Sequence, residues 1–283
     1  MGLLMTRASV VMPIYNHEAY LREAVHSVGN QSHPDTELIC IDDGSTDDSI
    51  NVTEAALAEV THPGFVVVQN NSGAHHALNR GASLASGELL FFLNSDDVFD
   101  LDRVTTFVRL WESQGKPDDF WGFSSAFFVD DEGDVVDPAG LDLSHLSDYN
   151  ACVDQQLWVD ELLAWHNVTL TSGNLVVTRS MFERTGGFEP YRMVHDWDMA
   201  FRLLLQASPI AVNRALYGYR IHGSNTFRTI PHGDAVRESE EVRTKFQNGL
   251  LKKCTEAPYA VHGVPFVDYL RMAFPMKVGM TGL

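Results

Sequence analysis

The first hundred residues alternate between short apolar runs and longer segments with helical periodicity. The apolar runs lie at residues 8–16, 37–42, 65–70 and 88–97. Between them, residues 20–28, 50–60 and 74–85 place apolar side chains at helical spacing. Parallel strands need a crossover connection, and a helix is the usual one. The sequence therefore predicts an α/β fold, with a mixed, mostly parallel sheet flanked by helices.

Beyond residue 101 the pattern is less regular but still mixes helix and strand. It predicts helices at residues 104–112, 154–165 and 196–206, and strands at residues 120–130 and 210–222. Gly186 and Gly187 predict a helix end followed by a tight turn. From residue 231 onward the chain is expected to be helical and peripheral.

Composition bounds the class of protein. The 283 residues are 45% hydrophobic, which is enough for a sizeable core in a globular chain. The net charge of −18 argues against nucleic acid as a partner and against anionic membranes. The three cysteines form no CxxC pair and predict neither disulfides nor a zinc site. With no signal-like or membrane-spanning segment apparent, the expected location is cytoplasmic.

Pairs of carboxylates follow two of the expected strands. Asp42 and Asp43 follow the second strand, and Asp96 and Asp97 follow the fourth. Carboxyl ends of parallel strands meet at one edge of a sheet, where such proteins bind ligands. A divalent cation would offset the charge near residues 94–97, because Mg²⁺ and Mn²⁺ favour oxygen ligands. For Asp42 the alternatives are a base or ribose contact, and simple turn and capping chemistry.

Four blocks of sequence resemble the family 2 glycosyltransferases, which have the GT-A fold. The blocks are "VVMPIYNHEAYLREAVHSVGNQSHPDTELICIDDGSTDDS", "NNSGAHHALNRGASLASGELLFFLNSDD", "TSGNLVVTRSMFERTGGFEPYRMVHDWDMAFRL" and "YRIHGSNT". They occur in the family's order between about residues 9 and 227. The resemblance implies transfer of a sugar from a nucleoside diphosphate donor to an acceptor hydroxyl, with inversion at the anomeric carbon.

The resemblance also implies a donor site and a metal site. The nucleotide-sugar site would comprise Pro13, Tyr15, Asn16, Asp42, Asp43, Asn79, Asn94, Ser95, Gly173 and Arg220. In it, Asp42 would contact the base, Asp43 would support the turn, and Arg220 would pair with phosphates. Mn²⁺ or Mg²⁺ would be held by Asp96, Asp97 and His222.

Two positions depart from the family's pattern. The metal-binding Asp-x-Asp falls on Asn94, Ser95 and Asp96, so its first residue is Asn. We expect metal binding to be retained, because a diphosphate supplies further oxygens; the alternative is a weakened or lost site. Asp196 matches the family's catalytic base, but the acidic residue that usually precedes it is His195 here.

We expect three other polar residues of these blocks to have no role in the site. We expect Asp198 to serve the structure of its helix, because an acidic residue in a first turn is favoured by the helix dipole. The histidines at positions 75 and 76 do not match the family, and we expect them on the surface.

The expected organisation is a GT-A domain over residues 1–230, with a nucleotide-binding half at about 1–100 and an acceptor-binding half at 101–230. Residues 231–283 would form a helical extension. That extension could cover the acceptor site, form a homodimer contact, or touch a membrane carrying a lipid-linked acceptor, and the net charge disfavours the last. The acceptor is a saccharide, a lipid-linked compound or another hydroxyl compound. Uridine diphosphate sugars are favoured as donors, ahead of guanosine and thymidine diphosphate sugars.

The sequence disfavours several other function classes. A nucleotidyltransferase of similar fold should carry a glycine-rich, basic loop after its first strand, and "PIYNHEAY" has neither glycine nor lysine. No GxxxxGK, GxGxxG or GxSxG motif supports an NTPase, a dehydrogenase or a serine hydrolase. A processive synthase is disfavoured because a QxxRW-type motif and membrane helices are missing. The remaining alternative is a degenerate nucleotide-sugar-binding protein without turnover, favoured only by Asn94 and His195.

Overall fold

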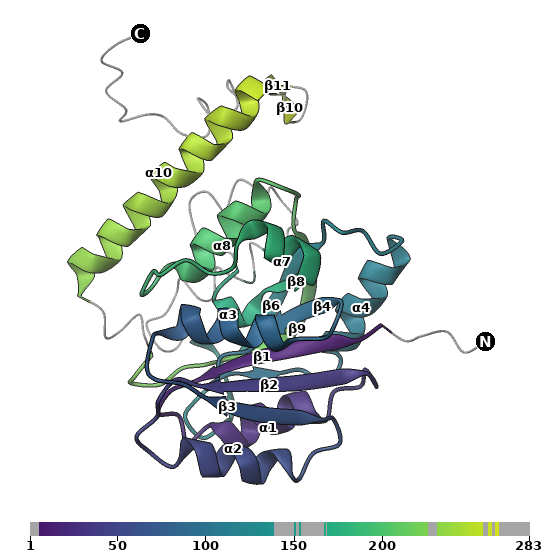
Figure 1. Ribbon diagram of the computed structural model, residues 1–283, viewed down its shortest axis with the longest axis vertical. Coiled ribbons are helices and arrows are strands. Elements are labelled where there is room, and N and C mark those ends of the chain that lie inside the picture. The colour runs from purple at the N-terminus through teal and green to yellow at the C-terminus, as the bar shows by residue number, and fades with distance from the viewer. Residues whose placement is uncertain are drawn as a thin grey trace.

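The computed structural model describes residues 6–138, 150, 153, 167, 169–225, 231–256, 260–261 and 264–265. Within these residues a nine-stranded sheet is covered by helices on both faces (Figure 1). The predicted α/β class with a mixed, mostly parallel sheet is confirmed. The expected helix at residues 154–165 lies outside the described residues.

The strands of the main sheet follow the order β3-β2-β1-β4-β8-β6-β9-β5, with β7 paired to β6. They are β1 (Ala8–Ile14), β2 (Thr36–Asp42), β3 (Gly64–Val68), β4 (Leu89–Phe92), β5 (Val98–Phe99), β6 (Trp121–Val129), β7 (Val135–Val136), β8 (Val176–Thr178) and β9 (Ile210–Arg220). The pairings among β1 to β4 and between β6 and β9 are parallel, whereas β8 runs antiparallel to both β4 and β6. A separate small hairpin pairs β10 (Ala260–Val261) with β11 (Val264–Pro265).

Helices connect and cover these strands. They are α1 (Leu21–Gly29), α2 (Ser49–Leu57), α3 (Ala74–Leu84), α4 (Arg103–Ser113), the short 3-10 helix η2 (Ser172–Asn174), α7 (Arg179–Thr185), α8 (His195–Leu204) and α10 (His232–Glu256). Helices α1, α2 and α4 pack on one face of the sheet, and α3, α7 and α8 on the other. No helix of the described residues is both long enough and apolar enough to cross a bilayer.

The two cores follow from the pleat of the central strands. Successive side chains of a strand point to opposite faces. In β4, Leu90 and Phe92 therefore enter the core under α3, α7 and α8, while Leu89 and Phe91 enter the core over α1 and α4. All four side chains are fully buried. Continuous apolar runs are typical of strands covered on both sides.

The fourth strand is shorter than the sequence predicts. The apolar run suggested a strand over residues 88–97, but β4 ends at Phe92. Residues 94–97 instead form a turn, in which the N–H of Asp97 donates to the carbonyl of Asn94 at 3.1 Å. Asn and Asp favour such turns because their side chains compete for backbone partners. The turn leads into β5, which pairs antiparallel with β9.

Helix α10 packs against α8 through a small aromatic cluster. The rings of Phe201 on α8 and Phe246 on α10 stack with centroids 4.2 Å apart and an interplanar angle of 10°. Both side chains are buried. Beyond this contact α10 is largely polar and extends along the outside of the molecule (Figure 1). The boundaries of the expected extension at 231–283 remain a prediction.

We predict that Phe246→Ala loosens α10 from α8. Removing a buried aromatic side chain should lower the free energy of unfolding by about 3 kcal/mol, or free the helix locally. Hydrogen exchange of residues 232–256 should become faster, and denaturant unfolding gives the global change. Val236→Ala is the control, because Val236 is an exposed apolar residue of the same helix. Equal exchange in the two variants would contradict the prediction.

Candidate functional site

The predicted site residues converge at the carboxyl ends of β1, β2 and β4. β1 pairs in parallel with both β2 and β4, so Ile14 lies opposite Asp42, and Val11 lies opposite Phe92. The loops that leave these three strands therefore start side by side. Open α/β sheets bind ligands at this edge. The expectation that two strands deliver carboxylates to one edge is confirmed.

Asp42 ends β2 with one carboxylate oxygen that has no partner. Its side chain is fully buried. Oδ1 accepts hydrogen bonds from the N–H groups of Gly44 at 3.1 Å and Ser45 at 3.0 Å. Oδ2 is buried without a hydrogen-bond partner. An unpaired buried carboxylate oxygen costs free energy. The turn uses Oδ1 alone, and Oδ2 is suited to a ligand N–H or O–H.

Asp43 uses both of its oxygens to hold the loop before α3. Oδ1 accepts from Nε2 of Gln69 at 2.7 Å and from the N–H of Ser72 at 2.9 Å. Oδ2 accepts from the N–H of Gly73 at 2.8 Å. These contacts describe the supporting role expected for this residue, and a direct nucleotide contact stays a prediction.

The loop after β1 contains one exposed ring and one residue that ties two loops together. Pro13 lies within β1 opposite Ile41, and the side chain of Tyr15 is exposed. Asn16 has a φ of +53°, a left-handed conformation that Asn tolerates better than most residues. Its Oδ1 accepts from the N–H of Thr46 at 2.7 Å. Asn16 thus joins this loop to the loop after β2.

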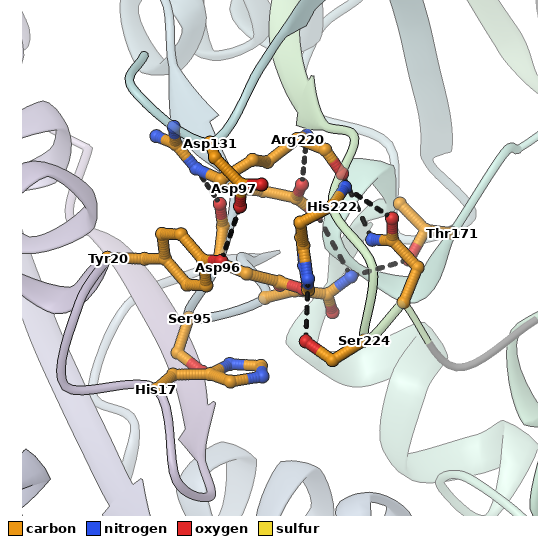
Figure 2. A network of polar contacts seen from close by, with 12 residues as sticks. His17, Tyr20, Ser95, Asp96, Asp97, Asp131, Thr171, Arg220, His222 and Ser224 are labelled. Atoms are coloured by element: carbon orange, nitrogen blue, oxygen red, sulfur yellow. Dashed lines mark hydrogen bonds and ion pairs between the residues drawn. The ribbon is translucent and has the colours of Figure 1, made fainter. Parts of the chain in front are cut away.

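Asp96 and His222 meet from opposite parts of the chain (Figure 2). Nε2 of His222, just after β9, lies 2.9 Å from Oδ2 of Asp96, and Nδ1 lies 2.8 Å from Oγ of Ser224. Burial opposes ionisation of Asp96, but the hydrogen bond from His222 and the charges of His17 and His222 outweigh it and lower the pKa of Asp96. An ionised carboxylate and an imidazole therefore converge here.

Asp97 points away from this pair and is surrounded by protein donors. The hydroxyl of Tyr217 donates to Oδ2 at 2.5 Å, and the N–H of Arg220 donates to Oδ1 at 2.8 Å. Nδ2 of Asn94 donates to Oδ2 at 3.1 Å. Burial, and then the charge of Asp96, raise the pKa of Asp97 well above its usual value. These contacts favour a supporting role over the predicted metal contact.

Arg220 is buried behind the turn at residues 94–97. Nε donates to the carbonyl of Asp96 at 2.8 Å and Nη1 to the carbonyl of Asp130 at 2.6 Å. Nη2 forms an ion pair with Glu23 at 2.5 Å. The sequence predicted a contact with phosphates, but each of these nitrogens has a protein acceptor. Arg220 therefore positions the backbone of Asp96.

Asn94 and Gly173 join the same turn to η2. Nδ2 of Asn94 donates to Oγ1 of Thr171 at 2.7 Å, and its Oδ1 accepts from Oγ of Ser172 at 3.1 Å. A Cβ atom on Gly173 would lie 2.0 Å from the hydroxyl of Tyr217. Packing within the protein therefore requires a glycine here, whereas the resemblance placed Gly173 in the nucleotide-sugar site. A ligand contact for either residue stays a prediction.

Asn79, on α3, contacts the turn after α7. Its Nδ2 donates to the carbonyl of Phe188 at 2.9 Å, and its Oδ1 accepts from the N–H of Phe188 at 2.8 Å. Both ends of the amide are therefore used to hold that turn. This geometry favours a supporting role for Asn79 over the predicted nucleotide contact.

Asp196 lies in the first turn of α8 and is buried. Nδ2 of Asn167 donates to Oδ2 at 2.7 Å, and the N–H of Trp197 donates to Oδ1 at 2.7 Å. Burial raises the pKa of Asp196, opposed by the charge of His195 and by these hydrogen bonds. A carboxylate with a raised pKa is suited to accept a proton. Asp198, in contrast, forms an ion pair with Arg202 one turn along α8.

His17 and Tyr20 also line the site, and sequence reasoning missed them. Nδ1 of His17 lies 2.8 Å from Oγ of Ser95, so the Ser95 side chain contacts a histidine. The ring centroids of Tyr20 and His222 are 4.9 Å apart, and the Tyr20 hydroxyl donates to Asp131 at 2.7 Å. Both residues belong to the connection after β1 (Figure 2). That position, at the carboxyl end of a strand, was the sequence signal that could have identified them.

We predict that Arg220→Gln destabilises the protein. The change leaves buried carbonyl acceptors without donors, so the free energy of unfolding should fall by about 2 kcal/mol. Urea unfolding measures the loss. Arg214→Gln, an exposed arginine of the same strand, should change the stability little. A variant of wild-type stability that binds nucleotide more weakly would instead support the phosphate contact.

Comparison with known proteins agrees with this geometry. Residues 9–131 match the family model described as glycosyl transferase family 2. An uncharacterised glycosyltransferase from Nostoc is 29% identical over 247 residues, which cover 86% of this chain and 72% of the relative.

Two solved structures have a similar fold. Residues 1–349 of TarS of S. aureus, in complex with UDP-GlcNAc, align with a TM-score of 0.63 and 16% identity, over 87% of this chain and 73% of that TarS chain. The mannosyltransferase PcManGT of Pyrobaculum calidifontis, in complex with GDP-Man and Mn²⁺, aligns with a TM-score of 0.58 and 17% identity, over 96% of this chain and 81% of PcManGT. Residues 9–131 thus match the family 2 glycosyltransferases in sequence, and the described fold is similar to that of two glycosyltransferases that carry a bound nucleotide sugar.

Proposed function

We propose that this chain transfers a sugar from a nucleoside diphosphate donor to an acceptor hydroxyl, with inversion at the anomeric carbon. The observation that carries the proposal is the convergence of Asp96 and His222 at 2.9 Å, at the same edge of the sheet as the unpaired carboxylate oxygen of Asp42. Oδ2 of Asp42 is suited to accept a hydrogen bond from an N–H group of the nucleobase. Asp96 and His222 are suited to hold a cation on the diphosphate. The setting would be cytoplasmic polysaccharide or glycoconjugate synthesis.

The residues of the pair fit a divalent cation. Asp96 offers an ionised and partly exposed carboxylate, and Ser224 binds Nδ1 of His222, which leaves Nε2 directed at the site. Among the described residues, no group of three or more His, Cys, Asp or Glu side chains could hold a metal. Two protein ligands suffice where a diphosphate and water complete the shell, as is usual for Mg²⁺. When bound, Mn²⁺ or Mg²⁺ would offset the negative charge that develops on the departing diphosphate.

Asp196 is the proposed general base. As the acceptor oxygen forms its bond to the anomeric carbon, the bond from that carbon to the diphosphate oxygen breaks. The acceptor's proton passes to the carboxylate of Asp196. The hydrogen bonds from Asn167 and the N–H of Trp197 orient that carboxylate, and its burial excludes water and increases its affinity for the proton.

The donor base and the acceptor are also part of the proposal. The two aligned structures bind UDP-GlcNAc and GDP-Man, so uridine and guanosine diphosphate sugars are the first donors to test. The acceptor would be a saccharide, a lipid-linked compound or another compound with a hydroxyl group. A homodimer or a peripheral membrane contact through residues 231–283 would be compatible with this role.

The alternative is a nucleotide-sugar-binding protein without turnover. Asn94, which occupies the first position of the metal motif, spends its amide on Asp97, Thr171 and Ser172. These contacts occupy the amide of Asn94 within the protein, and they leave Asp96 and His222 in place.

We predict metal-dependent release of the nucleoside diphosphate from one donor in a panel that includes UDP-GlcNAc and GDP-Man. Asp96→Ala and His222→Ala should lower release by about 100-fold or more and weaken Mn²⁺ binding measured by electron paramagnetic resonance. Asp134→Ala, an exposed carboxylate of the β6–β7 turn, is the control. Nucleotide binding without release, even with acceptors supplied, would favour the non-catalytic alternative.

The raised pKa of Asp196 predicts a pH dependence. Only the ionised form accepts a proton, so the acid limb of kcat/KM should lie above about pH 4, the ordinary range of an Asp. Asn167→Ala removes a hydrogen bond that favours the ionised form, so the limb should move to higher pH. Asn51→Ala, on the exposed face of α2, should leave it in place. A limb unmoved by Asn167→Ala would argue against Asp196 as the base.

A further inference from the structure

His17 is an imidazole at the site to which neither the family motif nor the proposed ion assigns a role. It lies in the loop after β1 and its side chain is half-buried. Its ring centroid is 6.2 Å from that of His222, with the rings nearly perpendicular. Figure 2 shows its ring reaching from the loop toward the side of the site that holds His222 and Ser224. The ring of His17 therefore lies beside the pair formed by Asp96 and His222.

The orientation of His17 is fixed on its other sides. Its backbone N–H donates to Oγ of Ser49 at 3.1 Å, which anchors the loop to the start of α2. Nδ1 contacts Oγ of Ser95 at 2.8 Å, and Ser95 is buried. Within the part of the chain that the structure describes, Nε2 of His17 forms no hydrogen bond with the protein. The contact at Nδ1 thus fixes the orientation of the ring, and Nε2 is available to a ligand.

We propose that His17 binds the diphosphate of the donor by donating a hydrogen bond from Nε2–H to a phosphate oxygen. In this arrangement the hydroxyl of Ser95 donates to Nδ1 and thereby places the proton on Nε2. Ser95 is then a positioning residue, whose side chain acts through His17. This inference rests on the proposed function, because it assumes that the site takes a nucleoside diphosphate.

A phosphate contact accounts for the geometry better than a third metal ligand does. Among the residues that the structure describes, His17 does not join Asp96 and His222 in a group able to hold a metal. A donor N–H beside the ion also suits the leaving group, which gains negative charge as its bond to the sugar breaks. Hydrogen bonds to charged groups are among the stronger ones in proteins.

Two variants of His17 test the roles of Nδ1 and Nε2 separately. His17→Asn keeps a polar atom near the position of Nδ1 and can still meet Ser95, but it lacks a donor at the position of Nε2. His17→Gln extends an amide N–H to about the position of Nε2. His26→Ala is the control, because His26 is an exposed histidine of α1 paired with Glu59. Calorimetry should compare UDP with uridine, and GDP with guanosine, for each protein in Mn²⁺ and in EDTA.

We expect His17→Asn to lose about tenfold or more in affinity for the diphosphate, with little change for the nucleoside. His17→Gln should stay within about threefold of wild type, and the losses should be similar with Mn²⁺ and EDTA. Wild-type affinity in His17→Asn, an equal loss for the nucleoside, or a loss confined to Mn²⁺ would overturn the inference. A wild-type protein that binds none of these diphosphates would overturn the proposed function as well.

Discussion

The carboxylate of Asp97 holds together the two strand ends that make the site. In the sheet order, β8 and β6 separate β4 from β9. At about 4.8 Å per strand, the ends of β4 and β9 would be roughly 14 Å apart. The chain bridges that gap because the turn after β4 crosses the edge of the sheet and continues as β5, which pairs with β9. Asp97 fixes the crossing by accepting from Tyr217 and from the backbone of Arg220, both on β9. Asp96 is thereby delivered to His222.

Two carboxylates of the site have environments that shift their pKa values in opposite directions. Asp96 is kept ionised by its imidazole neighbours. Asp196 is pushed toward the protonated form by burial. The first state suits a group that must carry charge, and the second suits a group that must take up a proton. Opposed environments of this kind are how one fold assigns different tasks to identical side chains. The proposed mechanism uses both, on opposite sides of the transferred sugar.

Much of the fold could be predicted from periodicity. The alternation of apolar runs and helical segments predicted β1 to β4 and α1 to α3, because buried parallel strands and their covering helices leave strong local patterns. The end of β4 was predicted too late, since an apolar run cannot show where Asn94 and Asp97 turn the chain. The crossing to β9 was not predicted at all, because pairing between distant strands has no local signal.

The resemblance gave both the positions of the site and roles for its residues, and the hydrogen-bond partners favour some of these roles over others. Asp42, Asp96 and His222 have the free or converging atoms expected of ligand-binding groups. Asn79 and Arg220 belong to the same motifs and yet use their polar atoms on the protein. A motif contains both kinds of residue, because ligand binding and loop formation each need particular side chains. Only the hydrogen-bond partners distinguish a residue that touches a ligand from one that holds the loop.

The contact between Asp96 and His222 joins residues 126 positions apart, and the ion pair of Glu23 with Arg220 joins residues 197 apart. Contacts of such long sequence separation form late, because the intervening chain must first be ordered. During synthesis on the ribosome, the strands that hold Asp42 emerge early, whereas β9 emerges after most of the domain. The loop at Asp42 can therefore leave the ribosome well before the contact between Asp96 and His222 can form. Under the proposed function, the nucleoside contact and the ion site would become available at different stages of synthesis.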